Sequence, residues 1–109
     1  METIQRQTLA GLSLLNTLNL DLNKLHTLHS GSFRNCTALA SLSLSHNFLT
    51  QVPEALHGLS LKMLNLDANL LGLLKRESLQ GLPKLVSLRL GKNELSRLGE
   101  FVQVFSGFE

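Results

Sequence analysis

An eleven-residue pattern of leucines and one asparagine, L-x-x-L-x-L-x-x-N-x-L, occurs four times along the 109-residue chain. The four copies are LNTLNLDLNKL (15–25), LASLSLSHNFL (39–49), LKMLNLDANLL (61–71) and LVSLRLGKNEL (85–95). Their asparagines, Asn23, Asn47, Asn69 and Asn93, are 24, 22 and 24 residues apart. Self-similarity at such a period indicates a repeat protein, in which each copy is one structural unit stacked on the next.

A second, shorter box lies between the copies of the first. It reads LAGL at Leu9, FRNC at Phe33, LHGL at Leu56, LQGL at Leu79 and FSGF at Phe105. We expect Phe33, Leu56, Leu79 and Phe105 to pack the return arm of each repeat. The single cysteine, Cys36, takes the place that leucine holds in other boxes, so we expect it to be buried as a small hydrophobe.

The L-x-L core of the pattern is too short to fold alone. Successive side chains of a strand point to opposite faces, so Leu42 and Leu44 should point inward and Ser41, Ser43 and Ser45 outward. One such turn cannot bury its leucines, but stacked turns form a parallel sheet and a continuous core.

The asparagine follows the strand, where the chain has to bend inside a crowded turn. A bend of this kind leaves backbone N–H and C=O groups unpaired, and unpaired groups are costly when buried. An inward asparagine amide carries both donors and acceptors, and it can therefore satisfy them.

Both boxes and their common period resemble the leucine-rich repeat family, over essentially the whole chain. The period is similar to that of the typical class found in Toll-like receptor ectodomains and small extracellular proteoglycans. The resemblance implies an α/β-type repeat solenoid with short parallel β-strands on a concave face and irregular or short-helical arms on the convex face. It also implies a structural ladder made by Asn23, Asn47, Asn69 and Asn93.

We expect residues 1–109 to form a single array, with about four repeats, a partial repeat at each end and no caps. Solenoids normally need polar terminal caps. The sequence therefore favours a fragment or a truncated form of a longer protein, with possible self-association through the uncapped ends.

Composition excludes several classes of partner. The 10 Lys and Arg against 8 Asp and Glu give a formal net charge of +2 without a basic cluster, which argues against nucleic acid. No apolar run is long enough for a membrane span in this segment. A single cysteine fits a reducing compartment, and it equally fits a piece of a secreted protein whose disulfides lie elsewhere.

The sequence predicts no enzyme, no cofactor and no metal site. It lacks G-x-S-x-G, H-E-x-x-H and Walker A motifs. His26 and His29 fall on an irregular loop without a third ligand. Asp21 and Asp67 lie two strands apart in one column, roughly 10 Å, which exceeds the carboxyl separation that glycosidases use.

The concave face is the predicted surface for a protein ligand or co-receptor. The candidate binding residues are Asn19, Asp21, Ser43, His46, Met63, Asn65, Asp67, Arg89 and Lys92. Among them, Arg89 lies diagonally from Asp67 and could form a surface ion pair with it.

Asn35-Cys36-Thr37 is a candidate N-glycosylation site at Asn35. Together with the repeat length, it favours a non-catalytic, ligand-binding segment of an extracellular or cell-surface receptor-like protein, as part of a longer chain. The alternative is a cytoplasmic scaffold, or the regulatory repeat region of a larger signalling protein.

Overall fold

The computed structural model describes residues 3–5, 8–72 and 76–93. In chain order the elements are β1 (Thr3–Ile4), β2 (Thr17–Asn19), β3 (Thr27–Leu28), β4 (Ser41–Ser43), the 3-10 helix η1 (Glu54–Leu56), β5 (Met63–Asn65), α1 (Arg76–Gln80) and β6 (Ser87–Arg89). Each copy of the eleven-residue pattern contributes one three-residue strand: β2, β4, β5 and β6.

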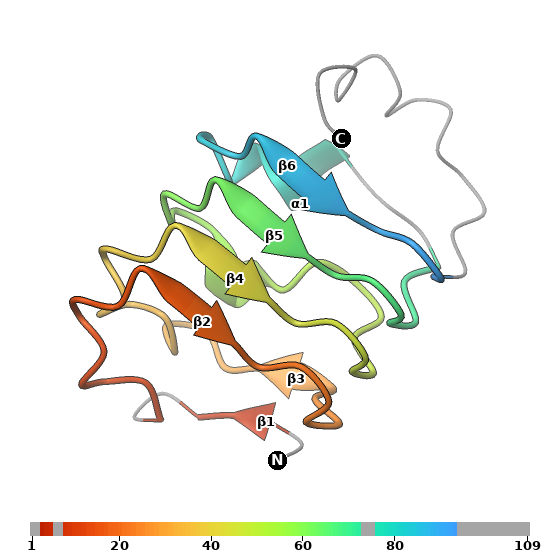
Figure 1. Ribbon diagram of the computed structural model, residues 1–109, viewed down its shortest axis with the longest axis horizontal. Coiled ribbons are helices and arrows are strands. Elements are labelled where there is room, and N and C mark those ends of the chain that lie inside the picture. The colour runs from red at the N-terminus through yellow and green to blue at the C-terminus, as the bar shows by residue number, and fades with distance from the viewer. Residues whose placement is uncertain (1–2, 6–7, 73–75, 94–109) are drawn as a thin grey trace.

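Four of these strands form one parallel sheet in the order β2-β4-β5-β6, with the strands side by side (Figure 1). The register aligns equivalent leucines of successive repeats, so that Leu18 pairs with Leu42, Leu42 with Leu64, and Leu64 with Leu88. The predicted stack of parallel strands is therefore confirmed. Equivalent concave residues of successive repeats lie side by side on neighbouring strands.

The core lies directly behind this sheet. Leu42, Leu44, Leu64 and Leu66 all point inward and are at most 2% exposed. The second box closes the core from the other side, because its residues Phe33, Cys36, Leu56 and Leu79 are buried as predicted. Phe105, which belongs to the same prediction, lies outside the described residues.

The convex side contains more regular structure than the sequence suggested. β1 and β3 form a second parallel sheet, in which Thr3 pairs with Thr27, and the His29 N–H donates to the Ile4 carbonyl at 2.9 Å. η1 and α1 lie behind the four-stranded sheet (Figure 1). Within the described ranges, no helix has the length and apolar character that a membrane crossing requires.

Pro53 explains why this second sheet stops after two strands. It stands 24 residues after His29, at the position whose N–H would donate to the Leu28 carbonyl. Proline has no backbone N–H, so the pairing between β1 and β3 cannot continue into the next return arm. The chain starts η1 at Glu54 instead, directly after Pro53.

Candidate functional site

The turns that end the concave strands are held by asparagine side chains. Asn47 is 2% exposed, and its Oδ1 accepts hydrogen bonds from the N–H groups of Asn23 and Leu25 at 3.0 and 2.9 Å. Its Nδ2 lies within donating distance of three carbonyl oxygens, those of Leu20, Leu44 and Ser45. One amide therefore joins its own turn to the turn before it.

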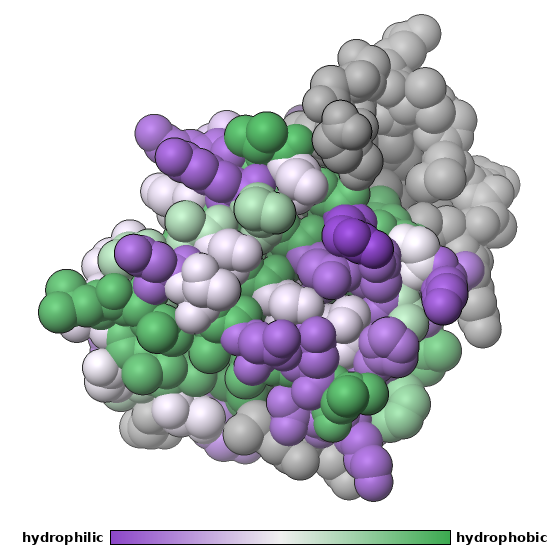
Figure 2. Space-filling model, in the orientation of Figure 1, coloured by the Kyte–Doolittle hydropathy of each residue, from purple (hydrophilic) through white to green (hydrophobic). Residues whose placement is uncertain are grey.

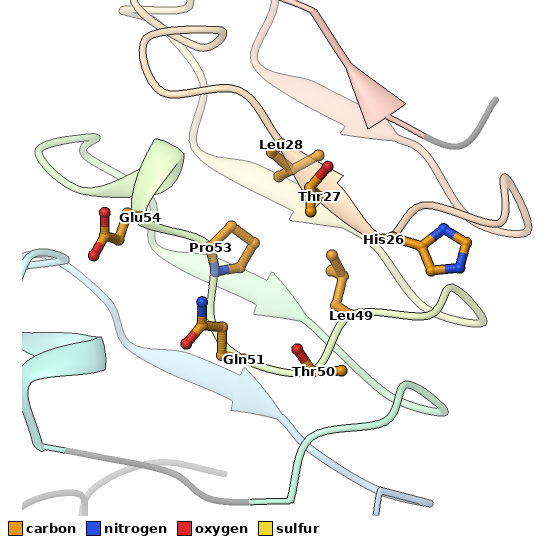
Figure 3. A pocket seen from close by; sticks show the side chains of 8 residues that line it. All are labelled: His26, Thr27, Leu28, Leu49, Thr50, Gln51, Pro53 and Glu54. Atoms are coloured by element: carbon orange, nitrogen blue, oxygen red, sulfur yellow. The ribbon is translucent and has the colours of Figure 1, made fainter.

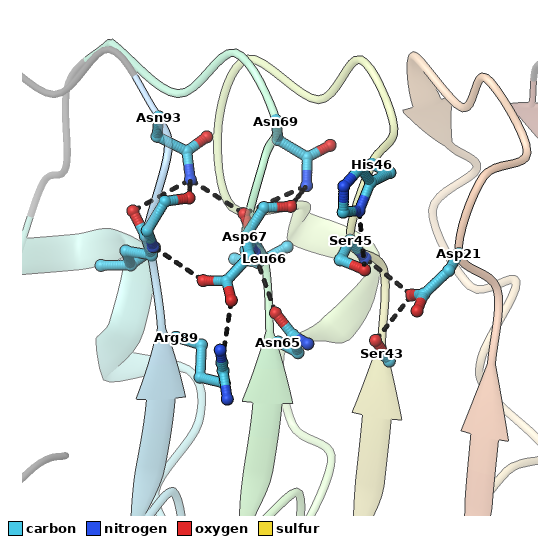
Figure 4. Close-up of polar contacts among 12 residues, drawn as sticks. Asp21, Ser43, Ser45, His46, Asn65, Leu66, Asp67, Asn69, Arg89 and Asn93 are labelled. Atoms are coloured by element: carbon cyan, nitrogen blue, oxygen red, sulfur yellow. Dashed lines mark hydrogen bonds and ion pairs between the residues drawn. The ribbon is translucent and has the colours of Figure 1, made fainter.

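Asn69 and Asn93 repeat this arrangement (Figure 4). The Leu49 N–H donates to Asn69 Oδ1 at 3.0 Å, and the Leu71 N–H donates to Asn93 Oδ1 at 3.1 Å. Asn23, in the first copy, donates through Nδ2 to the Leu20 carbonyl at 2.9 Å and to the Asp21 carbonyl at 3.2 Å, both within its own turn. The four asparagines thus form one line along the stack.

The residue before each of these asparagines has a left-handed backbone. Leu22, His46, Ala68 and Lys92 all have φ between 56° and 62°. This conformation is uncommon for residues other than glycine and costs roughly 1 kcal/mol or more. The asparagine hydrogen bonds offset that cost, and they fix a column of side chains, including His46 and Lys92, at the carboxyl edge of the sheet.

Asp21 links the first concave strand to the second. Its Oδ1 accepts from the Ser43 hydroxyl at 2.6 Å and from the Ser45 N–H at 2.8 Å. Asn19 in turn accepts the Asp21 N–H on its own Oδ1 at 2.8 Å. Ser45 lies against the Asp21 carboxylate on this face and is only 6% exposed, so its outward position leaves little of it in contact with solvent.

Asp67 makes the same link between the third and fourth strands. Its Oδ1 accepts from the Gly91 N–H at 2.7 Å, and Asn65 accepts the Asp67 N–H at 2.9 Å. Its Oδ2 meets Arg89 Nε at 2.8 Å, which confirms the predicted ion pair (Figure 4). A carboxylate therefore connects two neighbouring strands in the first and in the third repeat. Asp21 connects β2 with β4, and Asp67 connects β5 with β6.

The environment of Asp21 affects its ionisation. Partial burial raises the pKa of this carboxyl, but the hydrogen bonds from Ser43 and Ser45 outweigh burial. The net result is a pKa below the ordinary value for aspartate, so the folded chain keeps this carboxylate ionised further into the acid range than the unfolded chain does.

These contacts divide the predicted binding residues into two groups. Asn19, Asp21, Ser43, Asn65 and Asp67 use side-chain atoms to hold the face together. Met63 is 53% exposed, and His46, Arg89 and Lys92 are exposed as well. Figure 2 shows this face, where hydrophilic side chains gather toward the carboxyl ends of the strands and hydrophobic ones lie mainly at its margins.

A separate opening lies on the return side, where Pro53 interrupts the second sheet. Its volume is about 260 Å³, and His26, Thr27, Leu28, Leu49, Thr50, Gln51, Pro53 and Glu54 line it (Figure 3). The centroid of the His26 ring lies 5.2 Å from that of the Phe48 ring, with the two ring planes tilted by 34°. Among the residues that the structure describes, no group of three or more His, Cys, Asp or Glu side chains could hold a metal ion.

Asn35 and Cys36 lie next to each other on the return arm but in opposite environments. Asn35 is exposed, and its Nδ2 donates to the Ala10 carbonyl at 3.3 Å. Cys36 is a free thiol that is 1% exposed, and burial raises the pKa of this thiol. A neutral, buried thiol is a poor nucleophile, so Cys36 acts as part of the core.

The geometry agrees with a comparison against protein-family models. A model described as "Leucine rich repeat" matches residues 1–49 and, in an overlapping match, residues 13–71. Together the two matches span residues 1–71 of the 109, which is more than half of the chain. A search of curated proteins found no match.

Replacing Asn47 by alanine should destabilise the fold by about 1–3 kcal/mol, because several buried backbone groups lose their partner. Asn23→Ala is the matched control, since among the described residues the Asn23 side chain donates within its own turn, and its loss should cost less. Urea denaturation of the two variants and the wild type measures both effects. An unchanged midpoint for Asn47→Ala would show that the amide does not support the turns.

Acidification should remove the stability that the Asp21 carboxylate contributes. That contribution is fully present above the unfolded pKa of about 4, and it is lost as the pH falls through the lower folded pKa. Asp21→Asn should therefore lose less stability than the wild type between pH 6 and pH 3, as measured by urea denaturation. Ser43→Ala, which removes one donor, should fall between them. Equal losses in all three proteins would contradict the assignment.

Proposed function

The chain belongs to the leucine-rich repeat family, whose repeats generally act as protein-interaction modules rather than enzymes, and we propose that its concave face binds a protein ligand or co-receptor. The observation that carries this proposal is the fixed geometry of the face. Internal hydrogen bonds hold its frame, while Met63, Arg89 and Lys92 remain exposed on it. A preorganised surface of this kind loses little conformational freedom when a partner binds.

We further propose that the two ends of the stack take part in association. β2 is paired on one side only, because it is the first strand in the sheet order. Leu14, just before β2, and Leu22, just after it, are 89% and 74% exposed. An unpaired strand edge between exposed leucines favours contact with another copy of the chain.

Site-specific photo-crosslinking tests both contacts in one experiment. A benzophenone amino acid replaces Ser41 on the concave face, Leu14 at the β2 end, or Gln80 in α1 on the convex side. We expect the probe at Ser41 to capture a discrete heterologous partner and the probe at Leu14 to capture another copy of the chain. The probe at Gln80 should capture neither. Equal capture from Gln80 and Ser41 would contradict a concave binding site.

For the cellular setting, we propose that the chain is part of an extracellular or cell-surface receptor-like glycoprotein, either as a fragment or as a truncated form. Its repeat length resembles that of Toll-like receptor ectodomains. Asn35 is exposed on the return arm, so a glycan there would leave the concave face open. The buried Cys36 thiol is compatible with an oxidising compartment, because its burial keeps it from pairing with other thiols.

The single unpaired cysteine also supports the second candidate, a cytoplasmic scaffold or a regulatory repeat region of a larger signalling protein. Expression through the secretory pathway separates the two settings. We expect a glycosidase-sensitive shift in gel mobility that disappears in Asn35→Gln and persists in Asn16→Gln, at an exposed asparagine outside any sequon. The absence of any shift in the wild type would favour the cytoplasmic setting.

A further inference from the structure

The two halves of the concave face differ in what they offer to a partner. The β2–β4 half holds the Asp21 carboxylate, whose Oδ1 accepts from Ser43 and Ser45. On the β5–β6 half and directly before its strands, five side chains are exposed to solvent. These five, which we call the β5–β6 strip, are Lys62, Met63, Val86, Arg89 and Lys92.

Backbone contacts place the members of the β5–β6 strip on neighbouring strands. The Val86 N–H donates to the Lys62 carbonyl at 2.9 Å, so these two residues lie side by side where β5 and β6 begin. Arg89 ends β6, and Lys92 follows in the turn. From Val86 to Arg89 the strip extends for about 10 Å, at about 3.3 Å per residue, and Lys92 lies beyond this stretch in the turn.

The charge of the β5–β6 strip is positive. It contains three cations, and the acid beside them, Asp67, is 18% exposed at its side chain. Asp67 already accepts Arg89 Nε and the Gly91 N–H. The Arg89 side chain is still 66% exposed, so the rest of its guanidinium group faces solvent. The other described acids outside the first repeat, Glu54 and Glu77, lie in η1 and α1 behind the sheet.

The strip also has apolar surface and a concavity. Met63 and Val86 are 53% and 60% exposed beside the cations. A hollow of about 390 Å³ follows β6, lined by Asp67, Ser87, Leu88, Arg89, Leu90 and Gly91. Apolar side chains next to cations suit a ligand that alternates acidic and aliphatic groups. They are less suited to nucleic acid, which binds through several phosphate contacts and aromatic stacking.

We propose that the β5–β6 strip binds an acidic, extended segment of a partner protein, about six residues long, with aliphatic side chains between its carboxylates. This inference rests on the proposed concave binding function and names the chemistry of its partner. The carboxylates pair with Lys62, Arg89 and Lys92, and the aliphatic groups cover Met63 and Val86. Complementary charge raises the association rate and selects among partners.

The test uses the whole chain and a fluorescein-labelled peptide, acetyl-Glu-Asp-Leu-Glu-Leu-Glu-amide, with binding followed by anisotropy. The variant Lys62→Gln/Lys92→Gln leaves the Asp67–Arg89 pair intact and should weaken binding roughly three- to tenfold. The control Lys24→Gln/Lys84→Gln removes the same net charge at exposed lysines outside the strip and should change the affinity less than twofold. Circular dichroism confirms that both variants are folded.

The proposal is overturned if the control pair weakens binding as much as the strip pair does. It is also overturned if a neutral analogue of the peptide, in which Gln replaces each Glu and Asn replaces the Asp, binds as tightly as the acidic peptide. Equally tight binding of a hexathymidine oligonucleotide would overturn it as well. Crosslinking from Ser41 separates this failure from a failure of the proposed function. Capture from Ser41 without selective peptide binding means that the concave face binds a partner whose binding segment is not acidic.

Discussion

The side-chain amides of buried asparagines are the interaction on which the rest of this structure depends, because each one joins its own turn to the turn before it. Asn47 accepts two N–H groups from the first repeat, and its Nδ2 lies near carbonyl oxygens of both repeats. Without the amide, these buried peptide groups would lack partners at the point where the backbone adopts positive φ. The stack can therefore bury its leucines only because inward asparagine amides give the backbone N–H and C=O groups of the turns their hydrogen-bond partners.

The same asparagine hydrogen bonds determine which side chains the concave face exposes. They hold the strands in register, so residues of one column stand directly beside each other across β2, β4, β5 and β6. Asp21 and Asp67 then link alternate pairs of strands, and these acids become part of the frame. Positive and apolar side chains remain exposed over β5 and β6. In the proposed mode of binding, recognition and stability use largely different side chains of the same strands, with Arg89 shared between them.

Much of the fold follows from the sequence, because the leucine positions and the asparagine spacing repeat in a fixed register. Alternation within the L-x-L core placed Leu42 and Leu44 inward, and the period of the repeats predicted that the four strands stack in parallel. Contacts between repeats were harder to predict. The burial of Ser45 depends on the Asp21 carboxylate 24 residues earlier, and the pairing of β1 with β3 depends on Thr3 and Thr27, also 24 residues apart. A pattern within one repeat carries no signal for either contact.

Amide hydrogen exchange, measured residue by residue by NMR, tests the central role of the asparagines most directly. Leu25 and Leu49 lie outside the strands, and their N–H groups donate to the side-chain oxygens of Asn47 and Asn69. The account predicts that both amides exchange as slowly as the Leu66 amide, which donates to a backbone carbonyl of the next repeat. Exchange as fast as that of exposed turn amides would contradict the account.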